Sequence, residues 1–268
     1  MTAAPARPAL AQVLDLDRYP IDRPESPRGR ALVEFCRAAL AFEGACQLPG
    51  FLRPDAVRRL VDEALGKRGS AHRTDGTHNV YFEPVTDDGV ASLLQHSAKS
   101  AIAWDLVDDD SPLRVAYTSD ALTGFLARVL GPEQLHRFAD PLGAASLMVF
   151  DAGDELGWHF DRAPFAVTIM LQPGTAGGAY EYHHLLRTAD DENPDGVRAA
   201  LADERPGRIT LPNEPGTLSL FQGRYSLHRV TPVAGDRLRI NAVLAYSAPP
   251  DDRMNTLTQE LFYGRSAQ

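Results

Sequence analysis

The chain has few cysteines and no long apolar run. Its two cysteines, Cys36 and Cys46, are too few for a disulfide framework. Each lies in a stretch with a regular apolar pattern, so both are expected to be buried thiols. A membrane-spanning helix needs about 20 consecutive apolar residues, and the N-terminus lacks the basic start and apolar core of a signal peptide. The sequence therefore predicts a soluble, cytoplasmic protein without a membrane segment.

Basic residues are also in deficit. The 27 lysines and arginines are outnumbered by 36 acidic residues, which gives a net charge of -9. A protein that follows the phosphate backbone of DNA or RNA carries a basic patch. Nucleic acid is therefore not an expected partner. Acidity of this size is ordinary for an enzyme that acts on a small metabolite.

The order of elements is helices first and strands later. Ser26 and Pro27 are typical of a helix start, the spacing predicts a helix to Phe42, and Gly44 ends it. Two further helices are expected, and short apolar runs separated by Gly, Pro and Asp predict strands after residue 145. The helices are Pro54 to Leu65 and Ser111 to Leu130; the strands are Ser146 to Phe150, Phe165 to Leu171, Tyr180 to Leu186, Thr217 to Phe221 and Arg239 to Ser247.

Two polar regions interrupt this pattern. His72 and His78 lie in a segment that is expected to be a loop. The second region, Thr188 to Pro215, is highly charged, and a short helix is expected at Pro194 to Ala202. It is either a solvated surface insertion or a lid or wall over a pocket.

His159 and Asp161 are separated by two positions in an extended segment, so their side chains leave the same face. An imidazole and a carboxylate at this spacing can bind adjacent positions of one metal ion, with His228 as the candidate third ligand. Two histidines and one carboxylate are the facial ligand set of iron(II) oxygenases, which leaves positions for a bidentate cosubstrate and dioxygen. The alternative is a pair of hydrogen-bonded histidines in an antiparallel sheet.

Arg237 and Arg239 follow the third candidate ligand at nine and eleven residues. A guanidinium there can form a bidentate pair with the distal carboxylate of 2-oxoglutarate. Strand alternation predicts that both arginines share one face, so one is expected to be the anchor and the other a rim residue.

Together these residues resemble the iron(II)/2-oxoglutarate-dependent oxygenases, in particular the bacterial subgroup of free-amino-acid hydroxylases and radical halogenases. The resemblance covers about the last 125 residues and is carried by GWHFD (157–161), GGAYEY (177–182), DDEN (190–193), FQGRYSLHRVTPV (221–233) and RINAVLAY (239–246).

The resemblance implies a mainly β fold, a double-stranded β-helix of the jelly-roll or cupin type with flanking helices. It implies one oxygenase domain over 1–268, with a mostly helical portion at 1–140 that packs on the barrel, a metal-binding core at 141–250 and a possible lid at 186–215. It also places the cosubstrate arginine at Arg239. Halogenases of the subgroup have a small residue where Asp161 stands, so hydroxylation is expected.

The expected substrate is a free amino acid or a related small metabolite, oxidised at an unactivated C–H bond with release of succinate and carbon dioxide. The candidate substrate contacts are Arg162, His78, Asn79, Tyr81 and Glu181. Desaturation, epoxidation or a protein substrate are alternatives with the same cofactors. A cupin-like metalloprotein that is not an oxygenase, or a barrel that only binds, remain alternatives of a different class.

Overall fold

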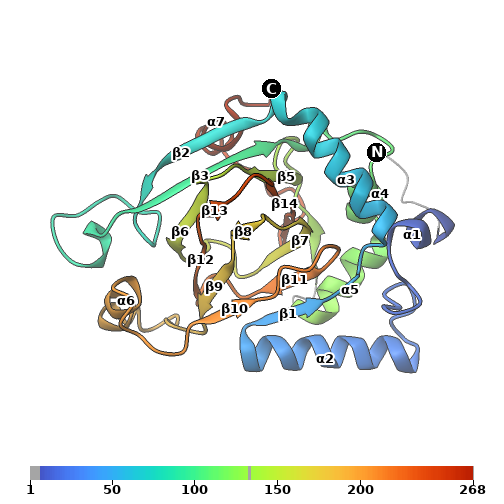
Figure 1. Ribbon diagram of the computed structural model, residues 1–268. Coiled ribbons are helices and arrows are strands. Elements are labelled where there is room, and N and C mark those ends of the chain that lie inside the picture. The colour runs from blue at the N-terminus through green and yellow to red at the C-terminus, as the bar shows by residue number, and fades with distance from the viewer. Residues whose placement is uncertain (1–6, 132–133, 268) are drawn as a thin grey trace.

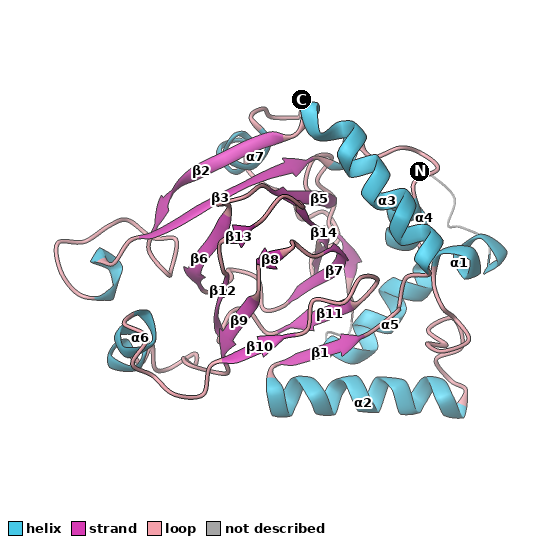
Figure 2. Cartoon of the chain, in the orientation of Figure 1, coloured by secondary structure: helices cyan, strands magenta, loops and turns pink. Residues whose placement is uncertain are grey.

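The computed structural model describes residues 7–131 and 134–267. Its strands curl around a common centre, and most of the helices cover the outside of one half of the curl (Figures 1 and 2). The helices are α1 (Arg7–Val13), α2 (Pro27–Glu43), α3 (Pro54–Lys67), α4 (Pro112–Tyr117), α5 (Asp120–Leu130), α6 (Pro194–Leu201) and α7 (Thr256–Tyr263), with short 3-10 turns η1 (Arg68–Ser70), η2 (Val90–Ser92) and η3 (Trp104–Leu106). The strands are β1 (Ala45–Leu48), β2 (His72–His78), β3 (Gln95–Ile102), β4 (His136–Arg137), β5 (Ala145–Phe150), β6 (Glu155–His159), β7 (Ala166–Gln172), β8 (Ala176–Gly177), β9 (Tyr180–His183), β10 (Ile209–Leu211), β11 (Leu218–Phe221), β12 (Leu227–Val230), β13 (Val233–Ala234), β14 (Arg239–Leu244) and β15 (Tyr246–Ser247).

One antiparallel sheet forms the frame, in the order β1-β11-β7-β14-β5-β3-β6-β12-β9-β10, with β2 paired to β3. β3 joins the two halves, because its end (Ser100 to Ile102) pairs with β5 and its middle (Ser97 and Ala98) pairs with β6. The sheet therefore bends around β3. This is the jelly-roll arrangement that the family resemblance implies.

Side chains on the central strands alternate between an outer and an inner face, as the pleat requires. On β14, Ile240 and Ala242 are buried in the main apolar cluster beneath the helices. Arg239, Asn241 and Val243 line an internal cavity instead. The outer face therefore supplies the hydrophobic core, and the inner face is free to carry polar groups.

The helix ends follow local sequence signals. The Ser26 side chain accepts a hydrogen bond from the Gly29 backbone N–H, and Gly44, with φ of 70°, ends α2. Both signals are confirmed. The predicted single helix from Ser111 to Leu130 is wrong, because the chain breaks between α4 and α5. There Ser119 is extended, and the Thr118 hydroxyl donates to the Arg114 carbonyl.

The predicted loop at His72 and His78 is also wrong, since these residues begin and end β2. β2 is a sheet edge, and most of its side chains are polar and exposed. Such a strand has no apolar alternation for a sequence pattern to detect. With β1, β3 and the two-residue β4, it makes four strands before residue 141 in the described part of the chain.

Cys36 and Cys46 are confirmed as buried free thiols. Among the residues that the structure describes, no helix has the length and apolarity needed to cross a bilayer.

The packing of α5 on the outer face generates a stability prediction. Phe125 is 1% exposed in the main apolar cluster. Phe125→Ala is expected to lower the free energy of unfolding by about 3–5 kcal/mol, because it removes buried apolar surface and leaves a cavity. Phe42 on α2 is 82% exposed. Phe42→Ala should therefore change the free energy of unfolding by less than about 0.5 kcal/mol. Denaturant unfolding measures both, and equal effects would contradict the placement of α5.

Candidate metal centre and cavity

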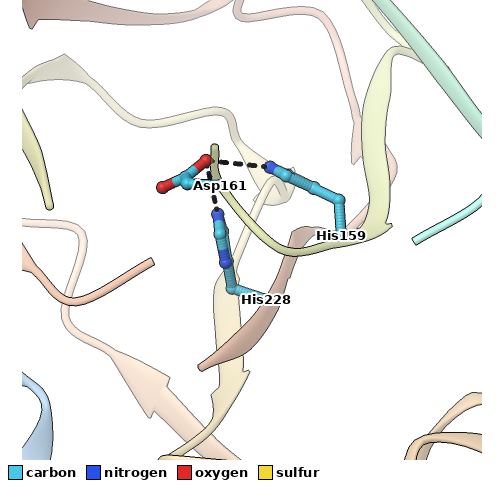
Figure 3. Close-up of side chains that lie close together, drawn as sticks. All are labelled: His159, Asp161 and His228. Carbon is cyan, nitrogen blue, oxygen red and sulfur yellow. Dashed lines mark ion pairs between the residues drawn. The ribbon is translucent and has the colours of Figure 1, made fainter. Parts of the chain in front are cut away.

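The pairing of β6 with β12 brings the candidate ligands together. His228 lies directly opposite His159 across these antiparallel strands. The chain then leaves β6, and the Asp161 backbone N–H donates to the Gly223 carbonyl 3.0 Å away. This turns the Asp161 side chain toward both imidazoles, as Figure 3 shows.

The three ligand atoms are close. Asp161 Oδ1 lies 3.7 Å from His159 Nε2 and 3.5 Å from His228 Nε2. All three atoms lie within 4.8 Å of one another, and no other such group of histidine, cysteine or acidic side chains occurs in the described part of the chain. Both histidines are buried. The structure thus brings together the three residues that the sequence predicts.

The protonation of the two imidazoles suits a metal ion. His159 Nδ1 lies 2.7 Å from the Gly157 carbonyl oxygen, and His228 Nδ1 lies 2.9 Å from that of Ser226. A carbonyl only accepts, so each Nδ1 carries a proton, and the neutral form of each ring presents its Nε2 lone pair toward Asp161. Burial, followed by the nearby His228, lowers the pKa of His159 to about 3, so its ring is neutral at neutral pH. Two imidazole lone pairs and a carboxylate that face one point can together bind a divalent metal ion.

Asp161 fits this role. Burial raises the pKa of its carboxyl, but His228 and His159 outweigh burial and hold that pKa below its usual value. Its Oδ2 is buried and has no hydrogen-bond partner among the described residues. A buried carboxylate oxygen without a partner is uncommon and is found at sites that bind an ion or an ordered water.

An internal cavity of about 180 Å³ adjoins the three residues. Its walls are apolar on several sides, and a few polar groups enter it. The apolar lining includes Phe150, Leu156, Met170, Phe221 and Val230; the polar lining includes Gln47, Lys99, Thr168, Asn213, Ser219, Arg239 and Asn241.

Arg239 is held rigidly in the cavity wall. It is 4% exposed, its Nε donates to the Gly178 carbonyl at 3.0 Å, and its Nη1 donates to Asn241 Oδ1 at 2.6 Å. Burial lowers the pKa of Arg239 to about 10. No carboxylate pairs with it within the described ranges. Its remaining N–H groups are therefore available to an anion.

Arg237 does not share that face, so the expectation of a common strand face is wrong. The strand β14 begins only at Arg239, and Arg237 lies in the preceding bend. There it is exposed and donates to the Gly174 carbonyl. Alternation does not extend into a bend, and only Arg239 lines the cavity.

A family model named Halogenase D matches residues 88–263, well over half of the chain. The chain belongs to the Halogenase D family. No curated protein sequence matches it significantly.

Solved structures share its fold. The non-heme alpha ketoglutarate dependent epimerase SnoN from nogalamycin biosynthesis is 18% identical, with a TM-score of 0.55 and 81% of each chain covered. AviO1 from Streptomyces viridochromogenes Tue57 is 20% identical, with a TM-score of 0.55, and covers 81% of this chain and 97% of its own. A prolyl hydroxylase from Trichoplax adhaerens, in complex with a hypoxia inducible factor peptide fragment, is 14% identical, with a TM-score of 0.53 and coverage of 80% and 88%. The resemblance to the iron(II)/2-oxoglutarate-dependent oxygenases is therefore confirmed, together with the double-stranded β-helix.

The five candidate substrate residues lie outside the cavity lining that the described residues form. Arg162 donates to the Phe82 carbonyl, and Tyr81 stacks on Phe160. Asn79 is fully buried, and its side chain forms hydrogen bonds within the loop that follows β2. Glu181 forms ion pairs with Arg229 and Arg208.

His78 has a positioning role in the structure. Its Nε2 accepts from the Ser97 hydroxyl at 2.7 Å, and the same oxygen accepts from the Gly157 backbone N–H at 3.0 Å. Its Nδ1 donates to the Asn79 carbonyl. His78 thus supports the strand that carries His159.

Several cavity residues escaped sequence reasoning, among them Gln47, Lys99, Tyr180, Asn213 and Asn241. They come from five different strands or loops, and no spacing rule connects them. Asn241 alone had a usable signal, because it lies two residues after Arg239 on the same strand face.

The closeness of Gly223 to Asp161 generates a prediction. A Cβ built at Gly223 would overlap the Asp161 carboxylate. Gly223→Ala is therefore expected to displace that carboxylate and to weaken iron(II) binding by about 10–100-fold, as the loss of ligand orientation does at other metal sites. Anaerobic iron(II) titration measures the affinity, and thermal unfolding of the metal-free protein measures the fold.

Gly124 provides the matched control. It lies in α5, and an added Cβ there meets nothing within 4 Å. Gly124→Ala should leave the iron(II) affinity unchanged. Loss of thermal stability in Gly223→Ala without a change in iron(II) affinity would assign Gly223 a purely structural role.

Proposed function

We propose that this oxygenase hydroxylates an unactivated C–H bond of a free amino acid or a related small metabolite. In this proposal His159, Asp161 and His228 hold iron(II), and Arg239 anchors 2-oxoglutarate. The supporting observation is the Asp161 carboxylate, which lies beside both histidine Nε2 atoms. It takes the place that a halide would need, although the family is named for a halogenase. Hydroxylation is therefore favoured over halogenation.

The overall reaction balances without a further reductant. One dioxygen is consumed with 2-oxoglutarate, which loses carbon dioxide and becomes succinate, and the second oxygen atom enters the substrate C–H bond as hydroxyl. Iron(II) supplies the site where 2-oxoglutarate and dioxygen bind and dioxygen is activated. One fold neighbour, SnoN, has been crystallised with Fe3+, alpha ketoglutarate and nogalamycin RO.

Other residues of the chain orient the metal ligands and the cosubstrate anchor and limit access of water. Gly157 and Ser226 hold the two imidazoles in the tautomer that leaves Nε2 free. Asn241 and Gly178 orient the Arg239 guanidinium for a bidentate pair with the distal carboxylate. Phe150, Leu156 and Phe221 limit access of water to the reacting groups.

The dimensions of the cavity support a small substrate. Its volume of about 180 Å³ is below the roughly 300–1,000 Å³ of pockets for drug-sized ligands. Leu211, Pro212 and Asn213, at the end of the 186–215 segment, line it. We propose that this segment closes over the substrate, which is the second of the two alternatives that its polarity left open.

The first prediction of this proposal concerns the cofactors. Anaerobic addition of iron(II) and 2-oxoglutarate should produce the weak visible metal-to-ligand charge-transfer band of the chelated complex. His159→Ala should lose the band because a ligand is gone, and Arg239→Ala should lose it at moderate cosubstrate concentration because the anchor is gone. Arg237→Ala is the matched control and should keep the band. No band in the wild-type protein would favour a cupin-like protein that is not an oxygenase.

The second prediction concerns the reaction outcome. Asp161→Gly should lower product formation by about 100-fold or more, since removal of a ligand costs at least as much as removal of its supporting partner. Mass spectrometry of reactions run with chloride separates products gaining one oxygen, losing two hydrogens or gaining chlorine. Asp161→Gly with wild-type hydroxylation would show that Asp161 is not a ligand. If the wild-type protein yields a product that has lost two hydrogens, the reaction is desaturation and the proposed hydroxylation is wrong.

A further inference from the structure

Lys99 is a second cation in the cavity wall. It lies on β3, two residues before Ala101, which pairs with the cavity residue Met148. Strand alternation therefore turns Lys99 to the inner face, and it lines the cavity with Arg239. Its Nζ lies 5.6 Å from the centroid of the Phe262 ring. Within the ranges that the structure describes, this ammonium has no hydrogen bond and no ion pair.

A count of charges sets Lys99 apart. The charged residues in the described cavity lining are Lys99, Arg239 and Asp161. Asp161 and the chelating carboxylate of 2-oxoglutarate together balance the two charges of iron(II), and the distal carboxylate balances Arg239. Lys99 then remains as a half-buried cation in the cavity wall without a counter-charge among the described residues. Burial lowers the pKa of Lys99 only to about 8, so it is mainly protonated at pH 7.

The position of Phe150 separates Lys99 from Arg239. Phe150 on β5 pairs with Arg239 on β14, and its ring centroid lies 4.9 Å from the Arg239 Cζ. β3 pairs with the opposite edge of β5. The backbones that carry the two cations are thus two strand spacings apart, about 10 Å. This favours two anion subsites over one shared carboxylate.

We propose that Lys99 binds a carboxylate of the substrate and so orients the carbon that is oxidised. The inference rests on the proposed function and narrows it, because it requires a substrate with a carboxylate in addition to the cosubstrate. A free amino acid meets this requirement. The competing assignment is that Lys99 assists Arg239 in binding 2-oxoglutarate.

The test uses the full chain loaded anaerobically with iron(II) and 2-oxoglutarate. The twenty L-amino acids and C3 to C6 aliphatic carboxylates are added singly, and binding is followed as a shift of the charge-transfer band. Each compound that binds is compared with its carboxamide. The variants are Lys99→Met, which removes the charge, Lys99→Arg, which keeps it, and Lys67→Met. Lys67 and Lys99 are the only lysines of the chain, and Lys67 pairs with Asp108 outside the cavity.

At least one carboxylate should shift the band of the wild-type protein, and its carboxamide should bind at least about 10-fold more weakly. Lys99→Met should weaken binding of the carboxylate at least about 10-fold. It should leave the affinity for 2-oxoglutarate within about 3-fold of the wild-type value. Lys99→Arg should recover part of the affinity, and Lys67→Met should behave as wild type.

Three outcomes overturn the inference. In the first, Lys99→Met weakens the binding of 2-oxoglutarate alone. In the second, Lys99→Met weakens the binding of the carboxylate and of its carboxamide equally. In the third, the wild-type protein shows the band, but no carboxylate shifts it. Absence of the band in the wild-type protein overturns the proposed function and this inference with it.

A measurement on the wild-type protein covers the case in which Lys99→Met does not fold. The loaded protein is treated with acetic anhydride, and acetylation of Lys99 relative to Lys67 is measured by mass spectrometry. The bound carboxylate should slow acetylation of Lys99 several-fold and leave Lys67 unchanged. An unchanged Lys99 rate would overturn the inference.

Discussion

The convergence of two imidazoles and one carboxylate on a single point is the constraint on which the rest of this structure depends. His159 Nε2, His228 Nε2 and Asp161 Oδ1 lie within 4.8 Å of one another. Both histidines are buried, so holding these polar atoms together costs free energy until a metal ion binds them. Only a rigid frame can hold these atoms together before a cation arrives. The pairing of β6 with β12, supported by Ser97 and His78, supplies that frame.

The two faces of the sheet have different roles in holding the three ligand residues in place. The outer face joins α2, α3 and α5 in one apolar cluster, which contributes most of the hydrophobic stabilisation. The inner face carries the buried Arg239 and the half-buried Lys99 and Asp161, charged groups that oppose folding to the extent that they lose water without gaining a partner. Because successive residues of a strand point to opposite faces, one strand contributes side chains to both the core and the cavity. On β14, successive residues such as Arg239 and Ile240 belong to the cavity and to the core.

The family and the fold do not by themselves choose the reaction. The fold neighbours include an epimerase and a prolyl hydroxylase, and the family is named for a halogenase. Reaction choice depends on the site rather than on the barrel. In this chain Gly223 leaves the space that the Asp161 carboxylate occupies, because a Cβ at position 223 would overlap that carboxylate.

The sequence by itself determined the features that depend on neighbours along the chain. The two-residue spacing of His159 and Asp161 placed both on one face, and Ser26 with Gly44 marked the ends of α2. Only the tertiary structure decided the rest. It brought His228 opposite His159 and placed Lys99 in the same cavity wall as Arg239. These outcomes depend on strand pairing between distant segments, whose register no local spacing encodes.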